Sequence, residues 1–306
     1  MLNNFSIMTD SPIRFPGLFG DWAFTGSGSI HIGSFSLHWY GILITLGLAL
    51  GSWFCLRHKE RYGIREDDFL DCLVWGIPGA IIGARIYYVL FYLDLYRGAD
   101  GSFQWGKAVA VWDGGLAIYG AVIAIVLIAL VICRIKKLKF FALTDFIVPG
   151  LLIGQIIGRW GNFMNREAFG GLTDLPWRME LTTVSGQAVC VHPTFFYESF
   201  WNLIGLLLVV LVISKNRHFD GENTWFYCLW YGFGRFWIEG LRSDSLYLFN
   251  WELFGQPIRV SQALSLVLVI AAGLMLLYHL KVVHHTPEEL FANAQKAQDP
   301  PENKED

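Results

Sequence analysis

Residues 140–167 read FFALTDFIVPGLLIGQII and then GRWGNFMNRE, so an apolar run stops where arginine, asparagine and glutamate side chains begin. The run is close to the roughly 20 residues that cross ~30 Å of hydrocarbon as a helix. The polar stretch 158–167 therefore starts at the depth where hydrocarbon gives way to water. An arginine can donate two parallel hydrogen bonds to a phosphate, and flanking glycines let backbone N–H groups approach an anion. The alternative is that these residues cap a helix and hold the following loop.

The composition of the whole chain excludes a soluble domain. Of its 306 residues 54% are apolar and only 16% are charged, and the mean hydropathy is +0.42. These values are typical of a polytopic membrane protein. The net charge of −3 gives no reason to expect a nucleic-acid partner. The cysteines show no C-x-x-C pair and no metal-ligand spacing, so we expect no metal site; they are Cys55, Cys72, Cys133, Cys190 and Cys228.

Seven apolar stretches are long enough to cross a bilayer as helices. They cover residues 37–56, 69–93, 116–133, 140–157, 195–214, 225–241 and 261–280. The predicted fold is an all-α integral membrane protein with seven transmembrane helices. Lysine and arginine are dense in the segments that follow the first, third, fifth and seventh stretches. By the positive-inside rule, the N-terminus lies outside and the C-terminus lies in the cytoplasm.

These spans divide the chain into three regions. Residues 1–36 form an extracytoplasmic N-terminal segment, and residues 37–283 form the seven-helix transmembrane domain. That domain includes an outer loop at 158–194. Residues 284–306 form a polar cytoplasmic tail to which we assign no function.

Polar side chains within the spans, or next to them, gather toward one side of the membrane. The predicted topology places these residues toward the outer leaflet: Tyr40, Arg85, Tyr119, Arg159, Glu198, Tyr231, Arg235, Glu239 and Arg242. An arginine in hydrocarbon costs about 2.5–3.5 kcal/mol even on lenient insertion scales, so it normally faces a partner or a cavity. Several at a similar depth indicate a site at the outer leaflet.

The sixth span places several of these groups on one helix face. Tyr231, Arg235 and Arg242 are separated by four and seven residues. Glu239 follows Arg235 by four residues and can pair with it, which leaves Arg159 and Arg242 for an anion. An anionic phospholipid suits guanidiniums beside hydrocarbon, because its phosphate accepts charged hydrogen bonds while its acyl chains stay in the bilayer. A channel for a small anion meets only the first of these conditions.

The stretch 158–167 resembles the signature of the bacterial prolipoprotein diacylglyceryl transferases, G-R-x-G-N-F-x-N-x-E. The resemblance extends along nearly the whole membrane region. Its further motifs are His38-Trp39-Tyr40-Gly41, Gly83-Ala84-Arg85-Ile86, Trp112-Asp113-Gly114-Gly115, His192-Pro193 with Tyr197-Glu198, and Tyr231-Gly232 with Arg235, Glu239 and Arg242. A signature with ordered satellite motifs of this kind is a specific match.

The resemblance implies a seven-helix enzyme of the bacterial inner membrane, with its active site toward the outer leaflet. Such an enzyme transfers the sn-1,2-diacylglyceryl group of phosphatidylglycerol to the lipobox cysteine thiol of a prolipoprotein. The transfer forms a thioether, releases glycerol phosphate and is the first step of lipoprotein maturation. The implied partners are phosphatidylglycerol, preprolipoprotein signal peptides with a lipobox cysteine, and membrane lipids.

Functional residues of the family carry over to the matching positions of this chain. The residues expected to bind phosphatidylglycerol are Arg159, Asn162, Gly170, Tyr40, Tyr231 and Arg85. The residues expected to take part in catalysis are Arg235, Arg242, Glu239 and Tyr119. The sequence contains no glycine-rich nucleotide loop and no nucleophilic serine or cysteine arrangement, so we expect no cofactor and no covalent enzyme intermediate.

One position departs from the family pattern. Many members read Gly-Gly-x-x-x-His-Gly-Gly, whereas residues 114–121 of this chain read GGLAIYGA, which places Tyr119 where the histidine often proposed as a base would stand. A tyrosine with a pKa of about 10 is a poor acceptor for a thiol proton whose pKa is about 8.5. We therefore expect arginine electrostatics to supply most of the rate, while Tyr119 orients or relays a proton.

Two other functional classes use similar residues. A transporter or flippase for an anionic lipid or solute needs polar residues at both faces or at the midplane, and often an internal repeat. In this chain the polar residues gather on one side and no repeat is evident. A lipid-binding scaffold without enzymatic activity needs neither the acid–arginine pattern nor Tyr119.

Overall fold

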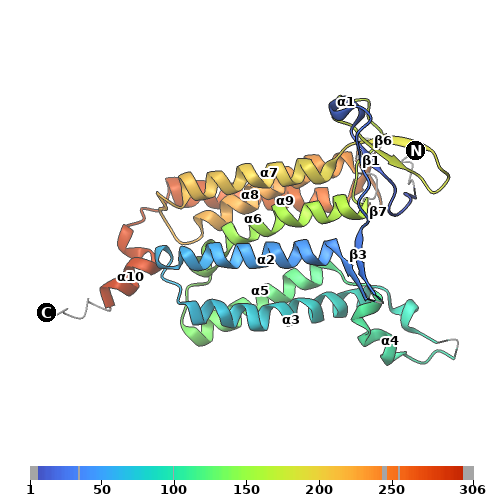
Figure 1. Ribbon diagram of the computed structural model, residues 1–306. Helices are drawn as coiled ribbons and strands as arrows, with labels where there is room; N and C mark the ends of the chain where they lie inside the picture. The colour runs from blue at the N-terminus through green and yellow to red at the C-terminus, as the bar shows by residue number, and fades with distance from the viewer. Residues whose placement is uncertain (1–5, 34, 99, 243–246, 254–255, 299–306) are drawn as a thin grey trace. The chain divides into compact units, whose positions relative to one another are not determined.

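The computed structural model describes residues 6–298 except 34, 99, 243–246 and 254–255. Most of this part of the chain is helical (Figure 1). The long helices are α2 (Trp39–Arg57), α3 (Glu66–Phe91), α5 (Ile118–Lys136), α6 (Phe140–Asn165), α7 (Thr194–Leu208) continued by a π-helical turn η4 (Val209–Ile213), α8 (Glu222–Leu241) and α9 (Val260–Lys281). The shorter helical segments are α1 (Pro16–Phe19), η1 (Lys59–Arg61), η2 (Leu93–Tyr96), α4 (Trp105–Val109), η3 (Val111–Asp113), η5 (Pro287–Glu289) and α10 (Phe291–Gln298).

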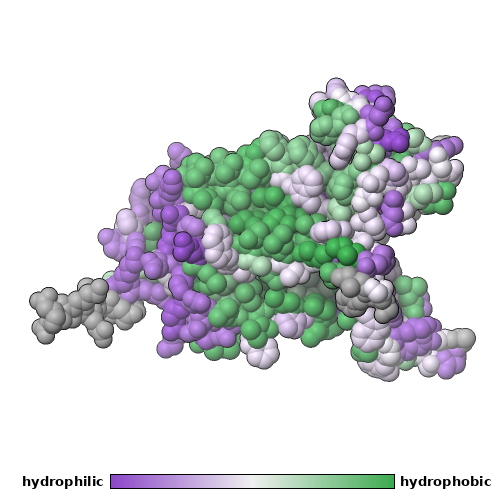
Figure 2. Space-filling model, in the orientation of Figure 1, coloured by the Kyte–Doolittle hydropathy of each residue, from purple (hydrophilic) through white to green (hydrophobic). Residues whose placement is uncertain are grey.

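Six of the helices in the described residues are long and apolar enough to cross a membrane. They are α2, α3, α5, α6, α7 with η4, and α9, and each overlaps a predicted span. Large apolar side chains on them are exposed, as the exposed fractions of Trp53 (60%), Trp75 (65%) and Leu127 (57%) show. In Figure 2 hydrophobic residues cover the helices and hydrophilic residues gather at their ends. Such a surface is stable against lipid, so the protein is a multi-pass membrane protein.

The other long helix, α8, has 20 residues and overlaps the sixth predicted span. It carries Glu222, Arg235 and Glu239, which lower its mean hydropathy, so it is not among those six. Both of its glutamates are buried inside the protein. Charged groups that turn inward are tolerated at membrane depth, and the seventh span stays a prediction.

The chain divides into two compact units, of which the first consists of residues 1–58 and 144–290 and the second of residues 59–143 and 291–306. In the second unit α3 packs along α5. The two helices approach closely at Gly83, where an added Cβ would lie 2.4 Å from the Ala124 Cβ and 2.6 Å from the Gly120 carbonyl oxygen. Of the polar tail predicted at 284–306, residues 299–306 lie outside the described residues.

Replacing Gly83 with alanine is expected to lower the free energy of unfolding by about 1–3 kcal/mol, because the added methyl group overpacks the contact between α3 and α5. The matched control is Gly76→Ala on the same helix, since no atom lies within 4 Å of a Cβ added there. Alanine at that position should stabilise α3, because alanine has the higher helix propensity. Thermal unfolding of both purified variants in one detergent measures the difference, and equal shifts would contradict this packing.

The first unit carries a four-stranded antiparallel sheet outside the long helices, in the order β2-β1-β5-β6. Its strands are β1 (Ile13–Arg14), β2 (Ala23–Phe24), β5 (Met179–Thr182) and β6 (Ala188–Val191). The N-terminal segment thereby pairs with the predicted outer loop, and Arg14 lies opposite Glu180. Residues of the sheet form a buried cluster with Phe195 at the start of α7, and Phe163 of the 158–167 stretch packs against it. The sheet therefore fixes the far end of α6.

Two hairpins complete the first unit. β3 (Ser29–Ile32) pairs with β4 (Phe35–His38), which leads directly into α2. β7 (Tyr247–Leu253) pairs with β8 (Gln256–Arg259) in the connection between α8 and α9. Neither hairpin follows from the hydropathy of the sequence, because two short strands carry no apolar run.

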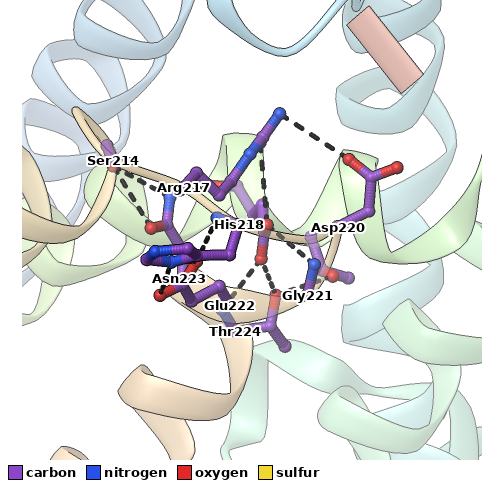
Figure 3. Close-up of polar contacts among 10 residues, drawn as sticks. Ser214, Arg217, His218, Asp220, Gly221, Glu222, Asn223 and Thr224 are labelled. Atoms are coloured by element: carbon purple, nitrogen blue, oxygen red, sulfur yellow. Dashed lines mark hydrogen bonds and ion pairs between the residues drawn. The ribbon is translucent and has the colours of Figure 1, made fainter. Parts of the chain in front are cut away.

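The opposite end of α6 holds α8 in place through one buried carboxylate, Asp145. Its partners Arg217, Gly221 and Thr224 are labelled in Figure 3. Its Oδ2 accepts a hydrogen bond of 2.8 Å from the Gly221 N–H, and its Oδ1 accepts one of 2.9 Å from the Thr224 N–H and one of 2.7 Å from the Thr224 hydroxyl. These N–H groups belong to the first turn of α8, which has no intrahelical acceptors for them. Arg217 lies 3.6 Å from the same carboxylate. Asp145 therefore caps α8 from a different helix.

Candidate active site

Helix α6 does not end where its apolar run ends. It continues through the first eight residues of the 158–167 stretch and stops at Asn165, which corrects the prediction that the outer loop begins at 158. Hydropathy marks membrane depth, whereas a helix needs only intrahelical hydrogen bonds, and polar side chains do not break these. The helix ends because Arg166 and Ala168 adopt left-handed φ angles of 54° and 55°. Arg159 therefore projects from a rigid helix.

Glu198, on the first turns of α7, is the centre of the polar cluster. Its Oε2 lies 2.5 Å from Arg159 Nη2, and its Oε1 lies 3.2 Å from Arg235 Nη1 and 3.8 Å from Arg242 Nη1. Only 4% of the Glu198 side chain is exposed. Three guanidiniums, from α6, from α8 and from the residue that follows α8, thus converge on one carboxylate of α7.

Arg235 and Glu239 also pair, with Nη2 and Oε2 2.6 Å apart, as their spacing on the helix predicts. The expectation that this pair leaves Arg159 and Arg242 free for an anion is wrong, because both contact Glu198. The sequence places these groups at similar depth but cannot show that a carboxylate from another helix lies between them. We call Arg159, Glu198, Arg235, Glu239 and Arg242 the arginine cluster.

The exposure of the arginine cluster is uneven. The side chains of Arg159, Arg235 and Arg242 are 22%, 18% and 12% exposed, whereas those of Glu198 and Glu239 are 4% and 2% exposed. Three guanidiniums against two carboxylates leave one net positive charge. An anion that approaches the cluster therefore meets guanidinium groups first.

Gly170 occupies a position with no room for a side chain. Its N–H donates to the His192 carbonyl (2.9 Å), and the neighbouring Gly171 N–H donates to the Leu241 carbonyl (2.7 Å). A Cβ on Gly170 would lie 2.7 Å from the His192 Cβ and 2.8 Å from the Leu241 oxygen. This glycine pair joins the segment before α7 to the end of α8 and holds Arg242 at that junction.

Asn162 lies one turn beyond Arg159 and links it to the following loop. Its side-chain oxygen accepts a bond of 3.3 Å from Arg159, and its side-chain nitrogen donates to Glu167 at 3.0 Å. Arg166 donates to backbone carbonyls of Ser11, Met164 and Gly26, at 3.0, 2.6 and 2.6 Å. The signature stretch thus orients Arg159 and also anchors the N-terminal segment.

Two tyrosines expected to bind lipid lie in the first unit, Tyr40 on α2 and Tyr231 on α8. The Tyr40 ring on α2 packs against Gly161, where an added Cβ would lie 2.7 Å from the ring. Tyr231 on α8 stacks on Tyr227, with ring centroids 5.5 Å apart, and the Tyr227 hydroxyl accepts a hydrogen bond of 2.7 Å from Gln155. Tyr40 therefore lies beside the signature stretch, and Tyr231 lies one turn before Arg235.

Arg85 and Tyr119 belong to the second unit. Arg85 is buried and donates to the carbonyls of Lys107, Ala108, Gly114 and Gly115, at 2.6, 2.9, 2.5 and 3.0 Å. Its guanidinium also lies 5.3 Å from the centre of the Tyr96 ring. In this geometry Arg85 anchors the segment before α5, and its expected role in lipid binding stays a prediction. Tyr119 lies at the start of α5 beside the Tyr87 ring, at 6.3 Å between centroids.

A family model described as prolipoprotein diacylglyceryl transferase matches residues 28–278. The chain belongs to this family. Three similar proteins are each named phosphatidylglycerol–prolipoprotein diacylglyceryl transferase. They come from Finegoldia magna (43% identical over 82% of this chain and 94% of the relative), Lactobacillus acidophilus (41%, 83% and 90%) and Oceanobacillus iheyensis (40%, 83% and 88%).

In this member of the prolipoprotein diacylglyceryl transferase family, further residues of the site come from the structure. Arg259, at the start of α9, donates to the backbone carbonyls of Glu239 and Arg242. It lies just before an apolar span, so hydropathy does not distinguish it from any other charged residue at the end of a transmembrane helix. His192 lies 3.3 Å from the Tyr197 hydroxyl, and burial lowers the pKa of its ring below the usual value. A neutral His192 suits a structural hydrogen bond.

Proposed function

We propose that this chain transfers the sn-1,2-diacylglyceryl group from phosphatidylglycerol to the lipobox cysteine thiol of prolipoproteins, forms a thioether and releases glycerol phosphate. The relatives named for transfer from phosphatidylglycerol to prolipoprotein support the substrates. The observation that carries the proposal is the convergence of Arg159, Arg235 and Arg242 at the ends of helices with lipid-facing surfaces. A phosphate with acyl chains suits that combination of charge and apolar surface.

The proposed topology has seven spans with the N-terminus outside and the C-terminus in the cytoplasm of a bacterial cell. In it residues 37–283 form the catalytic domain in the inner membrane, and the arginine cluster lies toward the outer leaflet. The support is the asymmetry of charge: lysine and arginine cluster after the first, third and fifth predicted spans, and Lys281 follows the seventh. Residues 1–36 and the four-stranded sheet that they form with the loop before α7 then lie outside, and residues 284–306 lie in the cytoplasm.

The proposed lipid site uses Arg159, Asn162, Gly170, Tyr40, Tyr231 and Arg85. Their roles differ in kind. Arg159 contributes charge, and Asn162 orients it through the bond between them. Gly170 lets the backbone junction beside Arg242 close. Tyr40 offers aromatic surface beside the signature stretch, and Tyr231 offers it one turn before Arg235. Arg85 orders the segment before α5.

In the proposed reaction the cysteine sulfur attacks the glycerol carbon that carries the phosphate. A sulfur–carbon bond forms, the carbon–oxygen bond to phosphate breaks, and glycerol phosphate leaves with the electron pair. The thiol proton passes to solvent or to the released phosphate monoester. Preorganised guanidiniums of Arg235 and Arg242 stabilise the charge that grows on the leaving phosphate, and Glu239 orients Arg235. Their positive field also favours the thiolate form of the incoming cysteine.

Replacing Tyr119 with phenylalanine is expected to lower kcat by roughly 10–100-fold, because the hydroxyl that orients or relays a proton is lost. The ring and its contact with Tyr87 remain, so the free energy of unfolding should change little. The measurement is kcat at several pH values for the two proteins. Tyr119→His is the matched variant, since it restores the residue type of many family members. Near-normal turnover of the phenylalanine variant at every pH would exclude a proton role.

The test of the proposed function uses purified protein, phosphatidylglycerol labelled in its diacylglyceryl group, and a lipobox peptide. A second peptide carries serine in place of the cysteine. The expected result is labelled thioether on the cysteine peptide alone. If folded protein binds phosphatidylglycerol but makes no product, the proposal is refuted, and a transporter or a lipid-binding scaffold is favoured.

A further inference from the structure

Glu198 holds the three guanidiniums in a way that resembles what a phosphate needs. One of its oxygens faces Arg159, and the other faces both Arg235 and Arg242. A phosphodiester also carries one negative charge and presents two non-bridging oxygens. Both groups therefore satisfy the same forked donors.

The three contacts with Glu198 differ in length. Arg159 lies 2.5 Å from Oε2, whereas Arg235 and Arg242 lie 3.2 and 3.8 Å from Oε1. The two longer contacts involve Arg235 of α8 and Arg242, which directly follows that helix. All three guanidiniums are partly exposed, so the length of the contact distinguishes the two oxygens of Glu198. The Oε1 side is therefore where an incoming anion can compete.

Taking the function proposed above as the starting point, we propose that Glu198 is a placeholder for the lipid phosphate. In the lipid-free protein its Oε1 contacts the guanidiniums of Arg235 and Arg242. When phosphatidylglycerol binds, these two guanidiniums leave Oε1 and contact the lipid phosphate instead. Arg159 stays on Oε2. After transfer Glu198 Oε1 re-forms its contacts with the two guanidiniums, which speeds the departure of glycerol phosphate. Glu198 acts through the arginines, so it is a positioning residue.

The structure holds α7 in place without the charge of Glu198. The Ser199 hydroxyl donates to the Ile156 carbonyl of α6 at 3.0 Å. Trp201 and Trp230 stack at 4.2 Å, and each indole N–H donates to the other's carbonyl at 2.9 Å. These contacts adjoin Glu198 on α7 and fix its register against α6 and α8. Neutralising Glu198 should therefore leave the helices where they are.

The exchange predicts an unusual kinetic signature for Glu198→Gln. Without the competing anion, phosphatidylglycerol binds more tightly, so KM for the lipid should fall by about tenfold, a typical size for coupling between competing ligands. The inhibition constants of glycerol phosphate and inorganic phosphate should fall by a similar factor. Slower product release should lower kcat as well. A merely structural role gives the opposite change in KM, because a distorted site binds lipid more weakly.

The experiment measures kcat, KM for phosphatidylglycerol and both inhibition constants for wild type, Glu198→Gln and Glu198→Asp. The aspartate keeps the charge but retracts it by one methylene, so its KM should lie between the other two. Asp68→Asn is the matched control: it neutralises another buried carboxylate, shared by Arg65 and Lys136, and should leave KM unchanged. Absence of turnover in wild type would refute the proposed function. If wild type is active but KM for phosphatidylglycerol is unchanged or raised in both Glu198 variants, the placeholder role alone is overturned. The same holds if KM for the lipid falls while the inhibition constant of inorganic phosphate does not change.

Discussion

Replacing Arg235 with alanine is expected to lower kcat/KM for diacylglyceryl transfer by roughly 10³-fold, the scale seen when one preorganised donor to a developing charge is lost. Arg235 bridges Glu198 and Glu239 at 3.2 and 2.6 Å, and both carboxylates are almost fully buried. Its removal takes a donor from the leaving phosphate. It also takes away the guanidinium 2.6 Å from Glu239 and cancels the net positive charge of the arginine cluster, which weakens the attraction for an anionic substrate.

Two further variants separate these effects of Arg235. Arg235→Lys keeps the charge but loses the planar fork, so only part of the activity should return. Arg235→Ala combined with Glu239→Gln removes one stranded charge, so stability should recover while turnover stays low. Recovery of turnover in the double variant would mean that Arg235 acts only by neutralising Glu239.

The matched arginine control is Arg14→Ala on β1 of the four-stranded sheet. Arg14 also pairs with a glutamate, Glu180, at 3.3 Å, but its side chain is 49% exposed. An exposed pair contributes about 0–1 kcal/mol, so activity should stay within about twofold of wild type. A large loss in this control would mean that the assay reports general damage to the first unit.

The sequence predicts the long apolar helices, because hydrocarbon imposes a length and a composition on every span. It also predicts the pairing of Arg235 with Glu239, since residues four apart on one helix are neighbours. It does not predict that Glu198 lies among three arginines, because that contact joins three helices and depends on their relative register. The same holds for Arg259, whose acceptors are backbone carbonyls at the end of another helix.

Hydropathy does not predict the strands or the last residue of α6, for a different reason. Strands β1 and β2 have two residues each, and β1 pairs with β5, which lies more than 150 positions away in the chain. No local pattern encodes such a pairing. The end of α6 is set by backbone dihedral angles at Arg166 and Ala168, residues that seldom adopt left-handed conformations. Contacts distant in the chain hold them there: Arg166 donates to the Ser11 and Gly26 carbonyls, and the Ala168 carbonyl accepts a hydrogen bond from the Thr194 hydroxyl.

Asp145 shows how a residue far along α6 supports the arginine cluster. It lies near the start of α6, whereas Arg159 lies near its end, so one rigid helix carries both. Asp145 caps the first turn of α8, and α8 carries Arg235 and Glu239 close to its other end, directly before Arg242. The capped end therefore sets the register of α8 against α6, on which the contacts of Glu198 depend.

Replacing Asp145 with alanine is expected to lower the free energy of unfolding by about 3–5 kcal/mol, because it removes one partner of a buried ion pair and the acceptor of three hydrogen bonds. Arg217 keeps its other contact, with Asp220 at 3.6 Å. Arg217 is only 4% exposed, and the N–H groups of Gly221 and Thr224 lose their acceptor. Thermal unfolding in detergent, followed by tryptophan fluorescence, measures the loss. The control is Asp71→Ala, whose carboxylate is 40% exposed and pairs with Lys136 at 2.6 Å, and it should cost no more than about 1 kcal/mol. Equal losses in the two variants would show that the cap on α8 contributes no more than a surface ion pair.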